Sequence, residues 1–174
     1  VQTLVNTIDD LNMDSVALTE HGNLFSVIPY YKSAKKAGVK PIIGCETYVA
    51  VGSRFEKKAR SDGGWGNNHL VLLAQNYTGY QNLMKLVTHG YLEGFYYRPR
   101  IDVDLLKEHS EGLICLSGCL KGEIPERMIK DDWKGAKDAA LRFAEIFEDR
   151  FYLEVQNHGI PDEIQNIKNM KKLS

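Results

Sequence analysis

Five apolar stretches alternate with helical patterns along this chain, and this alternation constrains its fold more than any other feature. Strand and helix in alternation are typical of a sheet whose strands are mostly parallel and are joined by right-handed crossovers. We therefore expect an α/β fold, either an open sheet or part of a barrel. The predicted strands cover residues 15–19, 39–51, 69–74, 113–116 and 151–155, and the predicted helices cover 3–12, 25–37, 79–91, 103–109, 124–130, 133–147 and a last one from about 161.

The stretch at 69–74 is apolar on both faces, which predicts a central strand parallel to its neighbours. Before it comes a segment rich in glycine and basic residues, at about 52–66. Such a composition predicts a flexible surface loop. We interpret its basic run, from Arg54 to Arg60, as a solvated loop rather than as a DNA groove.

The composition places the chain in a broad class. Its 174 residues are enough for one domain with a core, and we treat 1–174 as a single domain. The net charge of −1 gives no general basic field, so nucleic-acid contact would need a local patch or a neighbouring domain. Three cysteines do not form a disulfide framework, and we expect Cys45 and Cys115 to be buried thiols. No apolar run reaches membrane-spanning length, and we expect a cytoplasmic protein with no membrane partner.

Side chains that bind metals gather on or beside the predicted strands. Histidine, cysteine and carboxylate groups are ligands for Zn²⁺ and Mn²⁺. Ligands spread over several strands are typical of a site at the mouth of a barrel, unlike the local spacing of a zinc finger. Ordinary strand–helix loops and buried histidines with satisfied hydrogen bonds remain the alternative. The candidates are Glu20, His21, Glu46, His69, Cys119, Glu154 and His158.

An aromatic and basic loop at 94–100 is a candidate nucleic-acid contact. Charge and stacking together are typical of single-strand binding. A surface turn with aromatic packing accounts for the loop equally well. The candidate residues are Tyr96, Tyr97, Arg98 and Arg100.

Five stretches, taken in order, resemble the PHP (polymerase and histidinol phosphatase) domain. The resemblance is closest to the version at the amino terminus of bacterial DNA polymerase III alpha subunits. It runs along nearly the whole chain. The stretches are LTEHGN at 18–23, KPIIGCE at 40–46, HLVLLA at 69–74, GFYYRPR at 94–100 and LSGCLKGEI at 116–124.

The resemblance implies a distorted (βα)7 barrel with up to three metal ions at the carboxyl ends of its strands. It implies metal-ligand roles for His21, Glu46, His69 and Cys119. Two departures stand out. Glu20 occupies a position where the family usually has aspartate, and the family's opening His-x-His strand and closing Asp-x-His strand are both absent. We therefore expect an incomplete PHP barrel that lacks the first strand and the last strands.

The same resemblance implies part of a bacterial replicative DNA polymerase, whose DNA synthesis would use Mg²⁺ and carboxylates of a later domain. The PHP site itself would bind Zn²⁺ or Mn²⁺ and hydrolyse phosphoesters, as a phosphoesterase or 3′–5′ exonuclease. Implied partners are DNA, the remaining domains of the alpha subunit and a proofreading exonuclease subunit. Two alternatives remain: a stand-alone metallophosphoesterase of the histidinol-phosphatase kind, and a non-catalytic module that braces the polymerase.

Overall fold

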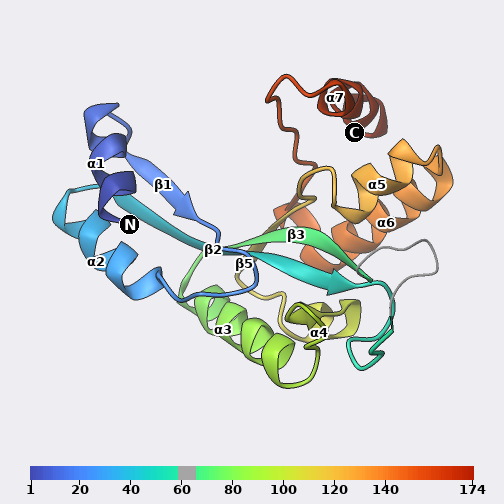
Figure 1. The fold of residues 1–174 in the computed structure, drawn as a ribbon, viewed down its shortest axis with the longest axis horizontal. Coiled ribbons are helices and arrows are strands. Elements are labelled where there is room, and N and C mark those ends of the chain that lie inside the picture. Colours follow the sequence, from blue (N-terminus) through green and yellow to red (C-terminus); the bar gives the residue numbers. More distant parts are fainter. Residues whose placement is uncertain (59–65) are drawn as a thin grey trace.

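The computed structural model describes residues 1–58 and 66–174 and has a mixed sheet with helices packed around it (Figure 1). Strand and helix alternate as the sequence predicts. The elements are α1 (Gln2–Asp10), β1 (Ser15–Leu18), α2 (Val27–Lys36), β2 (Lys40–Ala50), β3 (Asn67–Ala74), α3 (Tyr77–Leu92), β4 (Arg100–Ile101), α4 (Val103–Glu108), β5 (Leu113–Leu116), α5 (Glu123–Ile129), α6 (Trp133–Phe147), a 3-10 turn (Glu148–Arg150), β6 (Phe151–Tyr152) and α7 (Pro161–Leu173).

The sheet has the strand order β1-β2-β3-β5-β6, with β4 beside β2. Three pairings are parallel: β1 with β2, β2 with β4, and β5 with β6. Strand β3 lies centrally, as predicted, but the predicted parallel orientation is wrong, because β3 is antiparallel to both β2 and β5. The described residues between β2 and β3, 51–58 and 66, hold no helix, and a strand that returns without a helical crossover pairs antiparallel.

Strand β3 is covered on both faces. Leu70, Val71 and Leu72 follow one another and are each at most 7% exposed, although successive side chains point to opposite faces. Helices α3 and α4 lie on one side of the strands, and α5, α6 and α7 lie on the other (Figure 1). Coverage of this kind explains a strand that is apolar on both faces without requiring it to be parallel.

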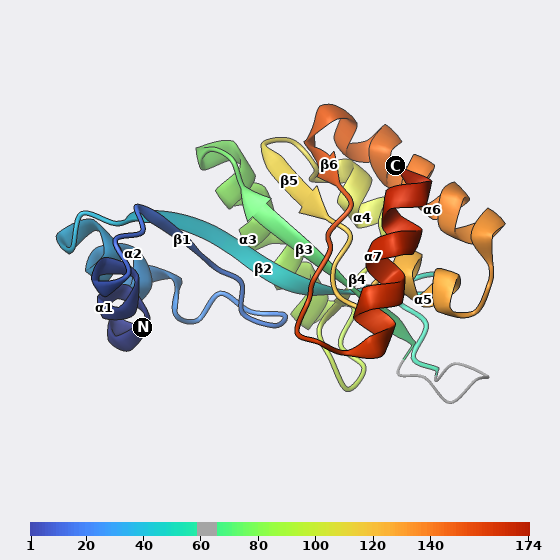
Figure 2. The same ribbon diagram turned by 90° about the horizontal axis from the view of Figure 1, so that it is seen from above.

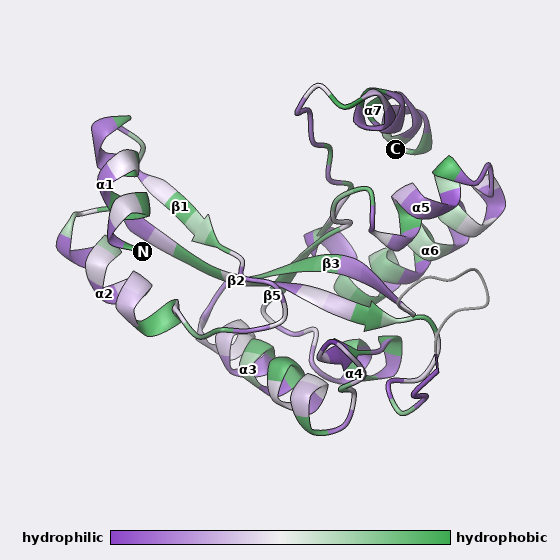
Figure 3. Ribbon diagram, in the orientation of Figure 1, coloured by the Kyte–Doolittle hydropathy of each residue, from purple (hydrophilic) through white to green (hydrophobic). Residues whose placement is uncertain are grey.

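Two hydrophobic cores divide the molecule. The larger core surrounds β3 and β5, while a smaller one holds Val5, Ile8, Tyr30, Ala34 and Val39 between α1, α2 and the adjoining strands. The smaller unit projects from the rest, and β1 and β2 connect it to the main body (Figure 2). Hydrophobic residues concentrate in the central strands, whereas α7 is largely hydrophilic (Figure 3).

The segment predicted as a flexible loop is described only in part. Residues 59–65, including Arg60, lie outside the described residues. Arg54 is not solvated as predicted, because its side chain is 14% exposed and pairs with Glu93 and Asp102. Asp102 also caps α4 by accepting a hydrogen bond from the Leu105 backbone at 3.0 Å. The start of this segment is therefore anchored to the α3–β4–α4 region.

Within the described ranges, no helix combines the length and the hydropathy that crossing a bilayer requires.

Candidate metal centre

His21 reaches the centre because the chain continues alongside β2 after β1 ends. The Glu46 amide donates to the Glu20 carbonyl at 3.0 Å, and the Gly22 amide donates to the Glu46 carbonyl at 2.9 Å. Gly22 has φ +68, and a Cβ there would lie 2.8 Å from Pro99 Cγ. Only glycine fits this turn without strain, and the turn places His21 beside Glu46.

Glu46 and His69 lie on the same face of the sheet. His69 stands opposite Tyr48 in the β2–β3 ladder, and Glu46 precedes Tyr48 by two residues on β2. Glu46 Oε1 lies 2.5 Å from His69 Nδ1 and 3.2 Å from His21 Nε2. The potential ligand atoms of these three residues all lie within 4.8 Å of one another. The antiparallel direction of β3 is what makes this possible, because it brings the start of β3 to the carboxyl-terminal half of β2.

Cys119 joins the group from the turn after β5. Gly118 has φ +80, and a Cβ there would lie 2.9 Å from the His69 carbonyl oxygen. Cys119 Sγ lies 3.7 Å from His69 Nδ1 and 3.9 Å from Glu46 Oε1. The structure thus brings together all four residues for which the family resemblance implies ligand roles.

The cluster is partly buried, and the side chains of Glu46 and His69 shift each other's pKa. The side chains of His69 and Glu46 are 11% and 17% exposed, whereas His21 is 55% exposed. The hydrogen bond from His69 is the main cause that lowers the pKa of Glu46, and burial opposes it. Burial alone would lower the pKa of His69, but its hydrogen bonds with Cys119 and Glu46 outweigh burial and raise that pKa to about 9. A metal ion that binds here must displace a proton from this pair.

The donor set fits a divalent transition metal. Imidazole, carboxylate and thiol groups converge, and these are the ligands of Zn²⁺, with Mn²⁺ favouring the oxygen and nitrogen donors. Bonds of about 2.0–2.3 Å place neighbouring ligand atoms roughly 3–4 Å apart. The contacts around Glu46 Oε1 span 2.5–3.9 Å, which needs only small side-chain movements to match.

The three other candidate ligands have other hydrogen-bond partners. The Glu20 carboxylate accepts hydrogen bonds from the Ser26 amide and hydroxyl at 2.9 and 2.8 Å, just before α2. Glu154 Oε1 accepts from Gln156, while its Oε2 is buried with no hydrogen-bond partner. His158 binds Glu163 in the first turn of α7. Neither Glu20 nor His158 is brought into the cluster, and no described contact joins Glu154 to it.

The aromatic and basic loop divides into residues with different roles. Arg100 is 2% exposed, and its guanidinium donates to the carbonyls of Gly94, Arg54 and Glu56 at 3.0, 3.3 and 2.8 Å. The prediction that Arg100 contacts nucleic acid is wrong, because backbone carbonyls use its donors inside the protein. Tyr96 is half-buried, with the Arg100 guanidinium over its ring, whereas Tyr97 is 66% exposed. Arg98 is exposed.

Sequence reasoning missed Tyr48. Its ring meets the His69 ring edge-on at 5.2 Å and lies 6.2 Å from the His21 ring. The signal was present in the sequence, because Tyr48 follows Glu46 by two residues and must share its face of the strand. Tyr48 forms an apolar wall beside the ligands.

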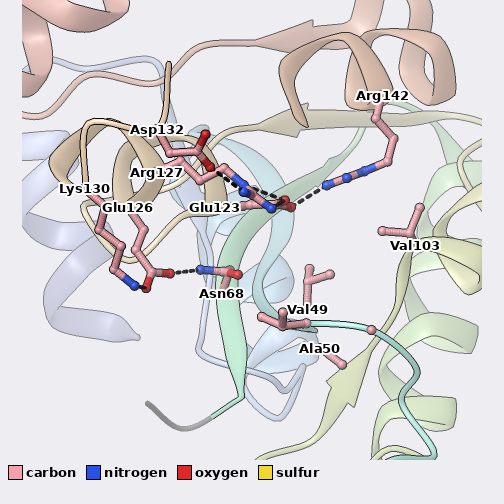
Figure 4. Close-up of a pocket in the computed structure, with 12 residues that line it drawn as sticks. Val49, Ala50, Asn68, Val103, Glu123, Glu126, Arg127, Lys130, Asp132 and Arg142 are labelled. Atoms are coloured by element: carbon pink, nitrogen blue, oxygen red, sulfur yellow. Dashed lines mark hydrogen bonds and ion pairs between the residues drawn. The ribbon is translucent and has the colours of Figure 1, made fainter. Parts of the chain in front are cut away.

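A pocket lies away from this cluster of four residues. It encloses about 290 Å³, and its charged side chains pair with one another (Figure 4). Arg127 binds both Glu123 and Asp132, and Arg142 binds Glu123. Three acidic residues face three basic ones, so the pocket presents balanced charge to a ligand. We interpret it as an ion-pair network that ties α5 to α6.

Comparisons with known proteins place the chain. The model of the PHP domain matches residues 1–158. DNA polymerase III subunit alpha of Borreliella burgdorferi is 51% identical over 94% of this chain, and that of Thermus aquaticus is 50% identical over 86%. The chain spans only 14% and 12% of these relatives. A solved structure from Bifidobacterium adolescentis, provisionally assigned as a metal-dependent phosphoesterase, covers 97% of this chain and 58% of its own, with a TM-score of 0.35 and 12% identity. On the match to its model, the chain belongs to the PHP domain family.

Proposed function

We propose that this chain forms a metal-dependent phosphoesterase site within a bacterial replicative DNA polymerase alpha subunit. The observation that supports it is the convergence of His21, Glu46, His69 and Cys119 from four separate segments. Such a donor set, gathered over one face of the sheet, is suited to holding Zn²⁺ or Mn²⁺.

Each residue of the cluster has a definable task in this function. His21, Glu46, His69 and Cys119 would hold the ions, which, when bound, polarise phosphoryl oxygens and activate water as a nucleophile at neutral pH. The Glu46–His69 pair would release the proton that it shares when these residues bind a metal ion. Tyr48 limits the access of water from one side.

The parent protein supplies the wider function in this proposal. The relatives are DNA polymerase III alpha subunits, and this chain spans 12–14% of their length. DNA synthesis would therefore depend on Mg²⁺ and on residues outside this chain. The proposed partners are DNA, the remaining domains of the alpha subunit and a proofreading exonuclease subunit.

The test measures metal content and hydrolysis in the full-length protein. We expect bound Zn²⁺ or Mn²⁺ by elemental analysis, and release of nucleotides from the 3′ end of a single-stranded oligonucleotide. A His21→Ala, Glu46→Gln double variant should lose both, with hydrolysis reduced by at least about a hundredfold because ligands act as a unit. Primer extension should persist in this variant, which shows that the protein is folded.

Glu20→Gln is the matched control, because it removes a carboxylate one residue from His21 without touching the cluster. It should retain metal and hydrolysis. Hydrolysis that survives the double variant contradicts the proposal. A protein with neither metal nor hydrolysis indicates the non-catalytic brace, and a preference for small phosphomonoesters indicates the histidinol-phosphatase kind.

A further inference from the structure

An exposed basic side chain from the 94–100 loop contacts the same tyrosine ring as His69 of the candidate metal centre. Arg98 Cζ is 5.7 Å from the centre of the Tyr48 ring, and that ring meets His69 edge-on. We propose that Arg98 binds the phosphate next to the reacting one on a polynucleotide strand. The site would then take strand ends in preference to small phosphoesters. This inference rests on the proposed phosphoesterase function.

The loop that carries Arg98 is held in a defined shape. The buried Arg100 guanidinium ties Gly94 to the carbonyls of Arg54 and Glu56. At the tip, the Tyr96 amide donates to the Arg98 carbonyl at 3.0 Å. The intervening Tyr97 has φ +56, a conformation that is uncommon for an aromatic residue. A loop anchored at its base and closed at its tip positions Arg98 reproducibly.

A second contact fixes this loop against the His21 turn. Pro99 follows Arg98 directly, and a Cβ on Gly22 would lie 2.8 Å from Pro99 Cγ. The two segments therefore approach as closely as a glycine allows. Tyr48 also lies against this turn, since the same added Cβ would lie 3.0 Å from its ring. Arg98 is thereby placed relative to His21 as well as to His69.

The charge of Arg98 is available to a ligand. Arg98 is exposed, and no carboxylate in 1–58 or 66–174 forms an ion pair with it. Arg54, by contrast, is held by Glu93 and Asp102, and Arg100 by backbone carbonyls. A guanidinium presents a planar fork of donors that matches two oxygens of one phosphate. Arg98 has this fork unused beside the proposed metal centre.

The contacts of Arg98 indicate which phosphate it would take. Arg98 and His69 both contact the Tyr48 ring, at 5.7 and 5.2 Å from its centre, and no described contact joins the Arg98 guanidinium to the four candidate ligands. We therefore assign Arg98 to a phosphate next to the one that the ligands would hold. A polynucleotide carries a further phosphate one nucleotide away, and a small phosphoester carries none. The arrangement therefore favours a substrate with a phosphate repeat.

The experiment compares two substrates in the full-length protein with Mn²⁺: a short single-stranded oligothymidylate and bis(p-nitrophenyl) phosphate. Arg98→Met should raise KM for the oligothymidylate about tenfold, since one charge-assisted phosphate contact is lost. It should leave kcat nearly unchanged and should not affect the small diester. The salt dependence of log KM should become shallower by roughly 0.7, the contribution of one contact to a single strand. Arg98→Lys should be intermediate.

Lys36→Met serves as the matched control, because it removes one exposed positive charge from α2 and should change none of these values. An Arg98→Met variant that affects both substrates equally, or neither, overturns the proposal. A wild-type protein that hydrolyses neither substrate contradicts the phosphoesterase function instead. Arg98 is then tested by photocrosslinking of an oligothymidylate with a 5-iodouridine end. Crosslinks to the peptide containing Tyr48, lost in Arg98→Met, support it, and their absence in the wild type overturns it.

Discussion

At the scale of single residues, the centre is organised by one carboxylate oxygen. Glu46 Oε1 lies within 4 Å of His69, His21 and Cys119, and the burial of His69 and Glu46 strengthens these contacts. The pair formed by Glu46 and His69 holds a proton more tightly than free imidazole does. This has a measurable consequence for the metal-free protein.

The metal-free protein should lose stability as the pH rises from about 6.5 to about 9. The pKa of His69 rises from its ordinary 6.5 to about 9 in the folded state. A histidine whose pKa is higher in the folded than in the unfolded state stabilises the fold fully when the pH is below its unfolded-state pKa. This stabilisation is lost as the pH rises through its folded-state pKa. The free energy of unfolding should fall by on the order of 1–3 kcal/mol. The shift of the urea midpoint with pH, in the presence of a chelator, measures this fall.

A His69→Asn variant provides the comparison, because its stability should be nearly flat over the same range. Metal affinity should change in the opposite direction and rise with pH, since ligands must lose protons to bind. Metal-free wild type whose urea midpoint does not change between pH 6.5 and 9 would count against a proton shared within the cluster.

At the scale of elements, the loop before β4 is a structural brace as well as a candidate binding surface. Arg100→Met should destabilise the protein by about 2–4 kcal/mol, because three carbonyls lose a charged donor. Thermal unfolding of the full-length protein measures this. Arg98→Met, two residues earlier and exposed, should change stability by less than about 0.5 kcal/mol. Equal effects of the two substitutions would argue against the division of roles in this loop.

Much of this architecture was predictable from local patterns. The strands and helices follow from periodicity, and most observed boundaries lie within two residues of those predicted. The direction of β3 was predicted from its apolar faces alone, whereas the loop predicted at about 52–66, which carries no helical pattern, favours the antiparallel return that the structure has. The two-residue β4 was missed, and β6 is shorter than predicted, since such short pairings depend on distant partners. Burial of Arg100 likewise depends on the carbonyls of Arg54 and Glu56, which lie far away in the sequence.

The candidate site shows the same limit. The sequence predicted which residue types gather at strand ends, and the structure brings His21, Glu46, His69 and Cys119 together. Glu20 and His158 are the same residue types and also follow predicted strands. Their side chains instead form hydrogen bonds at the starts of α2 and α7. Position along a strand does not reveal which way a side chain turns after the strand ends. The ligand roles themselves stay predictions.

At the scale of the whole molecule, two cores of unequal size share one strand. The smaller core, around α1 and α2, holds five buried residues, and Ile43 on β2 packs against both cores. Units with few buried contacts open more readily than the centre of a large core. Residues 1–38 should therefore be the least protected part of the metal-free fold.

Hydrogen exchange followed by mass spectrometry measures this difference. Without metal, amides in residues 1–38 should exchange faster than those of β3 and β5. Zn²⁺ at about a hundred times its dissociation constant should slow the exchange of these amides, because His21 follows β1. The free energy of their opening should rise by up to roughly 2.7 kcal/mol. The His21→Ala variant should not respond. Equal slowing across the whole chain would contradict this local coupling.

The place of His21 has a practical consequence. It is the candidate ligand that follows the smaller unit, whereas Glu46 and His69 lie on β2 and β3 and Cys119 lies in the turn after β5. An ion bound by all four residues would link the smaller unit to the main body. Chelators would then loosen the amino-terminal piece even if no phosphoester were ever cleaved there. A loss of stability that follows zinc depletion would then report on this coupling and not on hydrolysis, and a comparison of His21→Ala with Arg98→Met separates the two.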